Sequence, residues 1–219
     1  GVAFQISGEH RKSEAALNRS IAIFNELAML GEHYTLSMLS AECYIGENYQ
    51  WQGDCDKAEE HFLHCISVCE EKGLFWCCSH FHAHLADLAF DMGDMDLVAK
   101  NICRGVEVFE KTQGGRCGSM LYSLKSIVDA INNRYDDAYH ALEIGEMLSA
   151  PIRKRSWIAV HDMAKAYLAN MMEDGTIPPL FSKILTKSAK WYAAEAIRQY
   201  AQMPYPSRVN KLRDKFSIY

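Results

Sequence analysis

The stretch that decides the fold is Gln52-Gly53-Asp54-Cys55-Asp56-Lys57-Ala58-Glu59-Glu60-His61-Phe62-Leu63-His64-Cys65, because its pattern returns twice at a fixed distance. Gly53 has equivalents at Gly93 and Asn133, a spacing of 40 residues each time (93 − 53 and 133 − 93). The other repeating positions hold an aspartate (Asp56, Asp96, Asp136), a large apolar residue (Phe62, Ile102, Leu142) and a small residue (Cys65, Gly105, Gly145). A fixed period of this length is typical of stacked helical repeats.

The composition favours helices throughout. The 219 residues are 49% hydrophobic, which is enough for a continuous core. Only five of them are prolines, which break helices. Alanine, leucine, methionine, glutamate and lysine, which are good helix formers, are frequent. We therefore expect an all-α protein with almost no sheet.

The repeating unit predicts two helices joined by a tight turn. Gly53 ends a helix over 34–51, and Asp56 caps a second helix over 57–71. Further helices are predicted over 8–30, 76–92, 97–111, 120–132, 137–148, 156–172 and 180–203. The predicted organisation is about three and a half helix pairs over 1–150, a divergent helix pair that caps the array over 151–203, and a tail over 204–219 with at most a short helix.

Charge divides the chain into two parts. Residues 151–219 hold twelve lysines and arginines against five acids, a net of +7 (12 − 5), so the other residues carry −12 of the total of −5 (−5 − 7). A basic end of this kind docks on nucleic acid or on an acidic segment, or is simply a solvated helical face. Because the chain has no helix-turn-helix pattern with a recognition helix, we do not expect this fragment to bind nucleic acid.

The cysteines predict a reduced compartment. Four of the eight occupy apolar helical positions, where free cysteine acts as a small hydrophobe: Cys43, Cys65, Cys69 and Cys103. The chain opens without a charged, apolar leader and has no run long enough to span a membrane, so we predict a cytoplasmic protein. The sequence also begins without methionine and partway through the repeating pattern, which suggests a fragment of a longer chain. Cys117, in the glycine-rich stretch 112–118, is predicted to be the fastest-reacting thiol.

The order of side chains resembles the tetratricopeptide repeat. The matching residues are Gly46, Tyr49, the Gly53-Asp54 turn, Ala58, Phe62 and Cys65, and partial copies surround Gly93 and Asn133, so the likeness covers roughly 8–148. The family's usual unit has 34 residues. The longer unit is similar to repeats in the sensor regions of large LuxR-type, ATP-dependent bacterial transcriptional activators and in peptide-sensing regulators. The resemblance implies a right-handed superhelix of antiparallel helix pairs.

The resemblance also implies a binding surface on the concave wall, which the first helix of each pair lines. The site residues carried over in this way are Glu47, Trp51, His80, Asp87, Phe90, Asp91, Met120 and Ser123, beside Ser40, Cys43, Gln50, Ala83 and Ile127. Acidic and aromatic side chains there suit a ligand with a basic group and an apolar side chain, such as a peptide. On this interpretation, charge reversal at Asp87 and Asp91 abolishes binding without unfolding the chain. The alternative is that the copies merely stack and that these positions are ordinary solvated or buried ones.

A second candidate site is a metal site. Cys77, His80 and His84 share one face of a predicted helix at spacings of three and four, a geometry that suits Zn²⁺ with one further ligand, and Cys69 lies just upstream. The paired-ligand spacing of structural zinc sites is absent. Packing residues beside a polar groove are the alternative interpretation.

The sequence thus predicts a non-catalytic module that binds a protein, a peptide, a neighbouring domain or a small inducer, as the sensor or scaffold region of a larger bacterial transcriptional regulator. No nucleophile-elbow, phosphate-loop, zinc-protease or dinucleotide-binding motif is present, and no enzyme activity or cofactor is expected. The alternatives are a metal- or thiol-dependent sensor at 69–84 and a structural arm that forms homo-oligomers.

Overall fold

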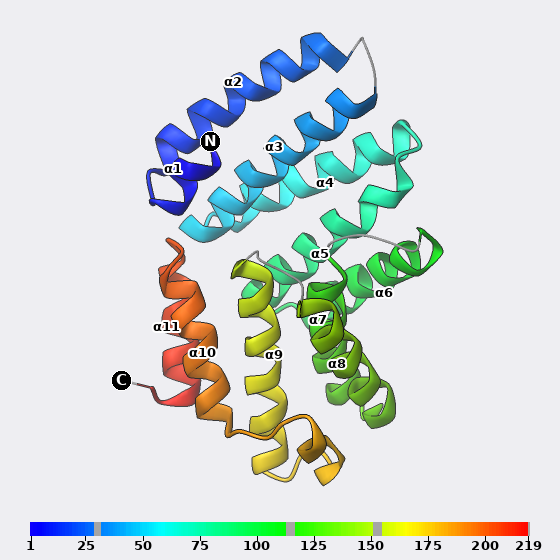
Figure 1. Cartoon of the computed structure of the whole chain (residues 1–219), viewed down its shortest axis with the longest axis vertical. Helices are drawn as coiled ribbons and strands as arrows, with labels where there is room; N and C mark the ends of the chain where they lie inside the picture. Colours follow the sequence, from blue (N-terminus) through cyan, green and yellow to red (C-terminus); the bar gives the residue numbers. More distant parts are fainter. Residues whose placement is uncertain (29–31, 113–116, 151–154, 219) are drawn as a thin grey trace.

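The computed structural model describes residues 1–28, 32–112, 117–150 and 155–218, and every regular element that it assigns there is helical (Figure 1). The elements are α1 (Val2–Ile6), α2 (His10–Ala28), α3 (Glu32–Gln52), α4 (Cys55–Glu71), α5 (Phe75–Met92), α6 (Met95–Thr112), α7 (Gly118–Ile131), α8 (Tyr135–Ser149), α9 (Arg155–Glu173), the 3-10 helix η1 (Pro179–Lys183), α10 (Ala189–Ala201) and α11 (Pro206–Phe216).

Consecutive helices pack against one another along the chain. The pairs α3 with α4, α5 with α6, α7 with α8 and α9 with α10 lie in extensive contact, and the pairs follow one another from the N-terminal to the C-terminal end (Figure 1). The predicted all-α solenoid is therefore confirmed. Among the residues described, no helix is long and apolar enough to cross a membrane.

The turn within each pair follows the repeating pattern. Gly53, Gly93 and Asn133 all adopt a left-handed backbone, with φ values of 84°, 78° and 59°. Glycine adopts this conformation without steric cost, and asparagine tolerates it better than most residues do. The three equivalent positions therefore reverse the chain in the same way.

The residue that caps the second helix differs from the one predicted. The side chain of Asp54 accepts a hydrogen bond from the Lys57 amide at 3.4 Å, and Asp94 accepts one from the Leu97 amide at 3.0 Å. Asp56 lies inside the first turn of α4, where its charge favours the helix N-terminus instead. The cap was therefore predicted two residues too late in the sequence, because α4 begins earlier than its apolar pattern indicates.

Gly46 lets α3 and α4 approach closely. A Cβ atom at this position would lie 2.6 Å from Cε1 of Phe62, whose side chain is fully buried. We expect Gly46→Ala to lower the free energy of unfolding by about 1–2 kcal/mol, because overpacking outweighs the better helix propensity of alanine. Urea unfolding measures this change.

The control for this prediction lies on the same helix. Ser40 is exposed on α3, so Ser40→Ala should change the free energy of unfolding by less than about 0.5 kcal/mol. Adding Phe62→Leu to Gly46→Ala should cost less than the two single changes together, since the smaller side chain relieves the clash. Wild-type stability in Gly46→Ala would contradict the predicted contact.

The C-terminal part departs from the sequence prediction. In place of one helix over 180–203, η1 is followed by α10, which begins after Ser188 and is capped by its side chain. The predicted tail contains α11, a full helix with Val209, Leu212 and Phe216 buried at spacings of three and four. These side chains join the main core, which explains why the segment is ordered as a helix.

The thiols are also arranged differently from the prediction. Cys117 is fully enclosed, its Sγ lies 3.5 Å from Oγ of Ser79, and burial raises its pKa to about 11. It is therefore a packing residue, and the prediction of fast reaction was wrong. Cys103, predicted to be buried, is exposed on α6. Cys43, Cys65 and Cys69 are buried as predicted.

Candidate functional site

A row of polar contacts joins the first helices of two successive pairs, α3 and α5. Cys43 Sγ lies 3.8 Å from Nε2 of His80, and Gln50 Nε2 donates to Oδ2 of Asp87 at 3.0 Å. Each of these contacts joins residues 37 positions apart. This spacing is one helical turn less than the 40-residue period (40 − 3), so the contacts join corresponding faces of α3 and α5 that are shifted by one turn.

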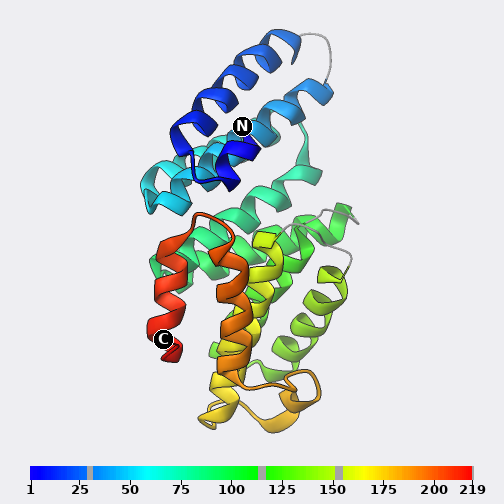
Figure 2. The ribbon, with the colours of Figure 1, turned by 60° about the vertical axis from the view of Figure 1, so that its left-hand side comes forward.

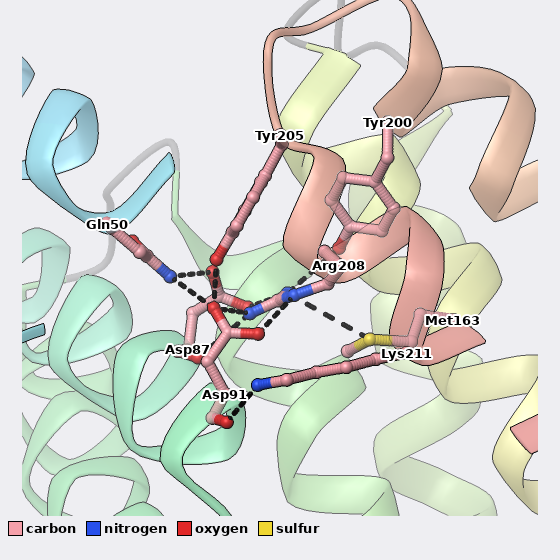
Figure 3. A network of polar contacts seen from close by, with 8 residues as sticks. All are labelled: Gln50, Asp87, Asp91, Met163, Tyr200, Tyr205, Arg208 and Lys211. Carbon is pink, nitrogen blue, oxygen red and sulfur yellow. Dashed lines mark hydrogen bonds and ion pairs between the residues drawn. The ribbon is translucent and has the colours of Figure 1, made fainter. Parts of the chain in front are cut away.

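The guanidinium of Arg208, on α11, lies at one end of this row (Figure 3). Its side chain is only 2% exposed. Nε donates to Oδ1 of Asp91 at 2.6 Å, Nη1 donates to Oδ1 of Asp87 at 2.7 Å, and Nη2 contacts Oδ2 of Asp91 and donates to the Asp87 carbonyl at 3.1 Å. Nη1 also donates to the Tyr200 hydroxyl at 3.0 Å. Arg208 thus bonds to both carboxylates through all three of its nitrogens.

Further side chains complete the environment of the two carboxylates. Gln50 Nε2 lies 3.0 Å from Oδ2 of Asp91 as well, and the Tyr205 hydroxyl donates to Asp91. The Tyr205 ring stacks on Trp51, with 6.1 Å between the ring centroids, and lies 5.1 Å from the Arg208 guanidinium carbon. The site therefore joins α3, α5 and the C-terminal segment (Figure 3).

The two carboxylates have different electrostatic environments. Burial raises the pKa of Asp87 despite the nearby guanidinium. Burial alone would also raise the pKa of Asp91, but the charge of Arg208 and the hydrogen bonds from Arg208, Tyr205 and Gln50 lower it below its usual value. Asp87 therefore takes up a proton before Asp91 does as the pH falls.

The structure corrects the predicted open surface. Asp87, Asp91 and Trp51 do come together, but they are buried against the chain's own α11 and the loop before it. Phe90 is half-buried, with its ring 5.2 Å from that of Tyr167 on α9. The polar side chains of the first helices predicted an accessible wall, yet α9 and α11 pack onto that wall: α9 makes ring contacts with it, and Arg208 of α11 pairs with its two aspartates. Figure 2 shows α11 beside α10, close to the end of α3.

Met120 and Ser123 lie elsewhere, in the core between α7 and α9. Ser123 Oγ lies 2.7 Å from Nδ1 of His161, and Nε2 of the same ring lies 2.6 Å from Oε2 of Glu146. The hydrogen bond to His161 lowers the pKa of Glu146 to about 2, and burial lowers that of His161. This order of groups matches a hydroxyl, base and acid relay, but the Ser123 side chain is fully enclosed and also donates to the Ser119 carbonyl at 2.6 Å. The hydrogen bond between Ser123 and His161 therefore holds α7 against α9, because the enclosed hydroxyl is not accessible to a substrate.

The predicted metal ligands are rearranged. The thiol of Cys77 lies beside that of Cys69, and the thiol near His80 belongs to Cys43 on α3. The ligand atoms of Cys43, His80 and His84 all lie within 4.8 Å of one another. The sequence prediction considered one helix only, so it missed the thiol that the preceding repeat supplies.

No protein-family model matches the chain, and no curated protein matches its sequence. Among solved structures it is similar to the crystal structure of the apo form of RapI, with a TM-score of 0.61 over 98% of this chain and 13% sequence identity. The chain spans 59% of the length of that protein. The likeness agrees with the helix packing, and together they define this chain as an all-α helical-repeat solenoid.

Proposed function

We propose that the chain is a non-catalytic module that binds a protein or peptide, and that Gln50, Asp87 and Asp91 receive an arginine side chain presented on a helix. The observation that carries this proposal is that α11 of the chain itself occupies the site in this way. Two carboxylates and an amide match the donors of a guanidinium, which forms directed pairs with carboxylates.

The surroundings of Arg208 support the same ligand chemistry. Its guanidinium carbon lies 5.3 Å from the ring of Tyr200 and 5.1 Å from that of Tyr205, distances at which aromatic rings attract cations. The opposite net charges of residues 1–150 and 151–219 favour the docking of the basic segment on the acidic one. A partner with an arginine and an apolar stripe on a helix would compete with α11.

The proposal extends to the context of the module. We propose that it is the sensor or scaffold region of a larger bacterial, cytoplasmic transcriptional regulator, in which a neighbouring segment, a peptide or a small basic inducer displaces α11. The resemblance of the long repeats to LuxR-type sensor regions supports this context. The likeness to RapI, of which this chain spans 59%, is consistent with a part of a longer protein.

A labelled peptide with the sequence of residues 204–218 tests the site. We expect the wild-type chain to bind it at least about tenfold more weakly than the Arg208→Ala and Arg208→Glu chains do, because the tethered α11 competes at a high effective concentration. Fluorescence anisotropy measures binding, and circular dichroism verifies that the variants remain helical. A peptide that carries alanine at position 208 should lose this binding.

The matched control is Arg198→Glu, which alters an exposed arginine bound to Glu195. It should bind the peptide as weakly as the wild-type chain does. Equal binding of the arginine and alanine peptides would contradict a site for arginine, and so would the absence of binding to both folded Arg208 variants.

A further inference from the structure

Helices α3 and α5 each carry a pair of side chains of the kinds that bind metal ions, and the two pairs face each other. Cys43 and Glu47 are four residues apart on α3, and His80 and His84 are four residues apart on α5. Residues at this spacing share one face of a helix. The repeat places the first members of the two pairs in contact and likewise the second members.

We propose that Cys43, Glu47, His80 and His84 bind one divalent transition metal ion of the zinc type. This site is independent of the protein-binding function proposed above. A thiolate, a carboxylate and two imidazoles are the ligand types that zinc takes, and four ligands complete its tetrahedral coordination. Helices α3 and α5 provide two ligands each, so the ion would join two successive repeats.

The separations of the ligand atoms suit such an ion. Cys43 Sγ lies 3.8 Å from His80 Nε2, and His84 Nε2 lies 3.6 Å from Glu47 Oε1. Ligand atoms around a tetrahedral zinc ion, with bonds of about 2.0–2.3 Å, are about 3.3–3.8 Å apart. The thiol and the two imidazoles lie within 4.8 Å of one another, so side-chain rotations can bring these three ligands to one ion. Glu47, next to His84, would supply the fourth ligand.

Charge and burial favour the same ion. Cys43, Glu47 and His84 are at most 3% exposed, and His80 is half-buried. A thiolate and a carboxylate together carry two negative charges, which a divalent cation neutralises. Since uncompensated charges are costly in a protein interior, this match stabilises the bound state.

Neighbouring side chains orient the ligands. The Phe62 ring stacks on His84 at 5.2 Å, and the Trp157 ring meets the edge of His80 at 5.7 Å. Gln5 Nε2 lies 3.5 Å from the second carboxylate oxygen of Glu47. Groups that hold metal ligands in place from outside raise the affinity of a site. The site thus has both ligands and supporting contacts.

Cobalt(II) provides a direct probe. The full chain, stripped of metal by a chelator and kept reduced, should bind one Co²⁺ per chain, with a thiolate-to-cobalt charge-transfer band and the visible bands of tetrahedral cobalt. Zinc should displace the cobalt and raise the melting temperature. Cys43→Ser should lose the charge-transfer band, and its affinity should fall at least about 10–100-fold, the range seen when even an outer partner of a ligand is removed.

The controls use the same residue types at exposed positions, Cys103→Ser and His140→Gln, both of which should bind cobalt as the wild type does. His80→Asn is a second test variant if Cys43→Ser does not fold, because His80 is the least buried of the four ligands. The proposal is overturned if the folded wild type binds less than stoichiometric cobalt, if no thiolate band forms, or if a folded ligand variant binds as tightly as the controls.

Discussion

Replacing Arg208 by alanine is expected to lower the free energy of unfolding by about 3–5 kcal/mol, the usual cost of removing one partner from a buried ion pair. The side chain is 2% exposed and bonds to both Asp87 and Asp91. Without it, the carboxylates lose the charge that compensates their burial. Urea unfolding at neutral pH, followed by circular dichroism, measures the loss.

A surface arginine provides the control for this prediction. Arg198 pairs with Glu195 on the exposed face of α10, so Arg198→Ala should cost at most about 1 kcal/mol. Arg208→Lys should fall between the two alanine variants, because lysine keeps the charge but cannot bond to both carboxylates as the planar guanidinium does. A loss below about 1 kcal/mol in Arg208→Ala would show that the pair contributes little.

The second large effect is expected from reversing both charges, in the double variant with Asp87→Lys and Asp91→Lys. Two lysines beside buried Arg208 would place three cations where the side chains of Asp87 and Asp91 are at most 10% exposed. We expect the free energy of unfolding to fall by more than about 5 kcal/mol, which approaches the total stability of a typical domain. The soluble fraction and the far-ultraviolet circular dichroism of the purified chain measure the outcome.

The matched control reverses two exposed acids on α4, Glu60→Lys and Glu71→Lys, with the same change in net charge. That variant should remain folded. The expectation drawn from the sequence, that reversal at Asp87 and Asp91 leaves the fold intact, is corrected by the burial of both side chains. A double variant as stable as its control would mean that α11 leaves the site in solution.

The helix pairs could be predicted from the sequence because their signals are local. Gly53 and Gly93 mark the turns, and apolar residues at spacings of three and four mark the buried faces. The position of the cap was wrong by two residues, since an aspartate in the first turn and one at the cap look alike in sequence. Packing contacts such as the one between Gly46 and Phe62 follow from the same pattern.

The candidate site could be predicted only in part, because its completion depends on distant residues. Asp91 and Arg208 are 117 positions apart, and no local pattern relates them. The apolar residues Val209, Leu212 and Phe216 did carry a signal for α11, at helical spacing. Likewise, Cys43 could have been related to His80 by superimposing the two first helices at the 40-residue period, because His80 lies one helical turn before the equivalent position (83 − 3).

The bonds of Arg208 also bear on how the chain unfolds. An array held together only by contacts between neighbouring repeats can lose its structure from one end while the other end stays folded. Here α11 returns to α5 across 117 to 121 residues, so opening at the C-terminal end disturbs the middle of the array. Backbone amides in α5 and α11 should therefore exchange with solvent through one shared opening. Closing so long a loop also slows folding compared with an open array of the same helices.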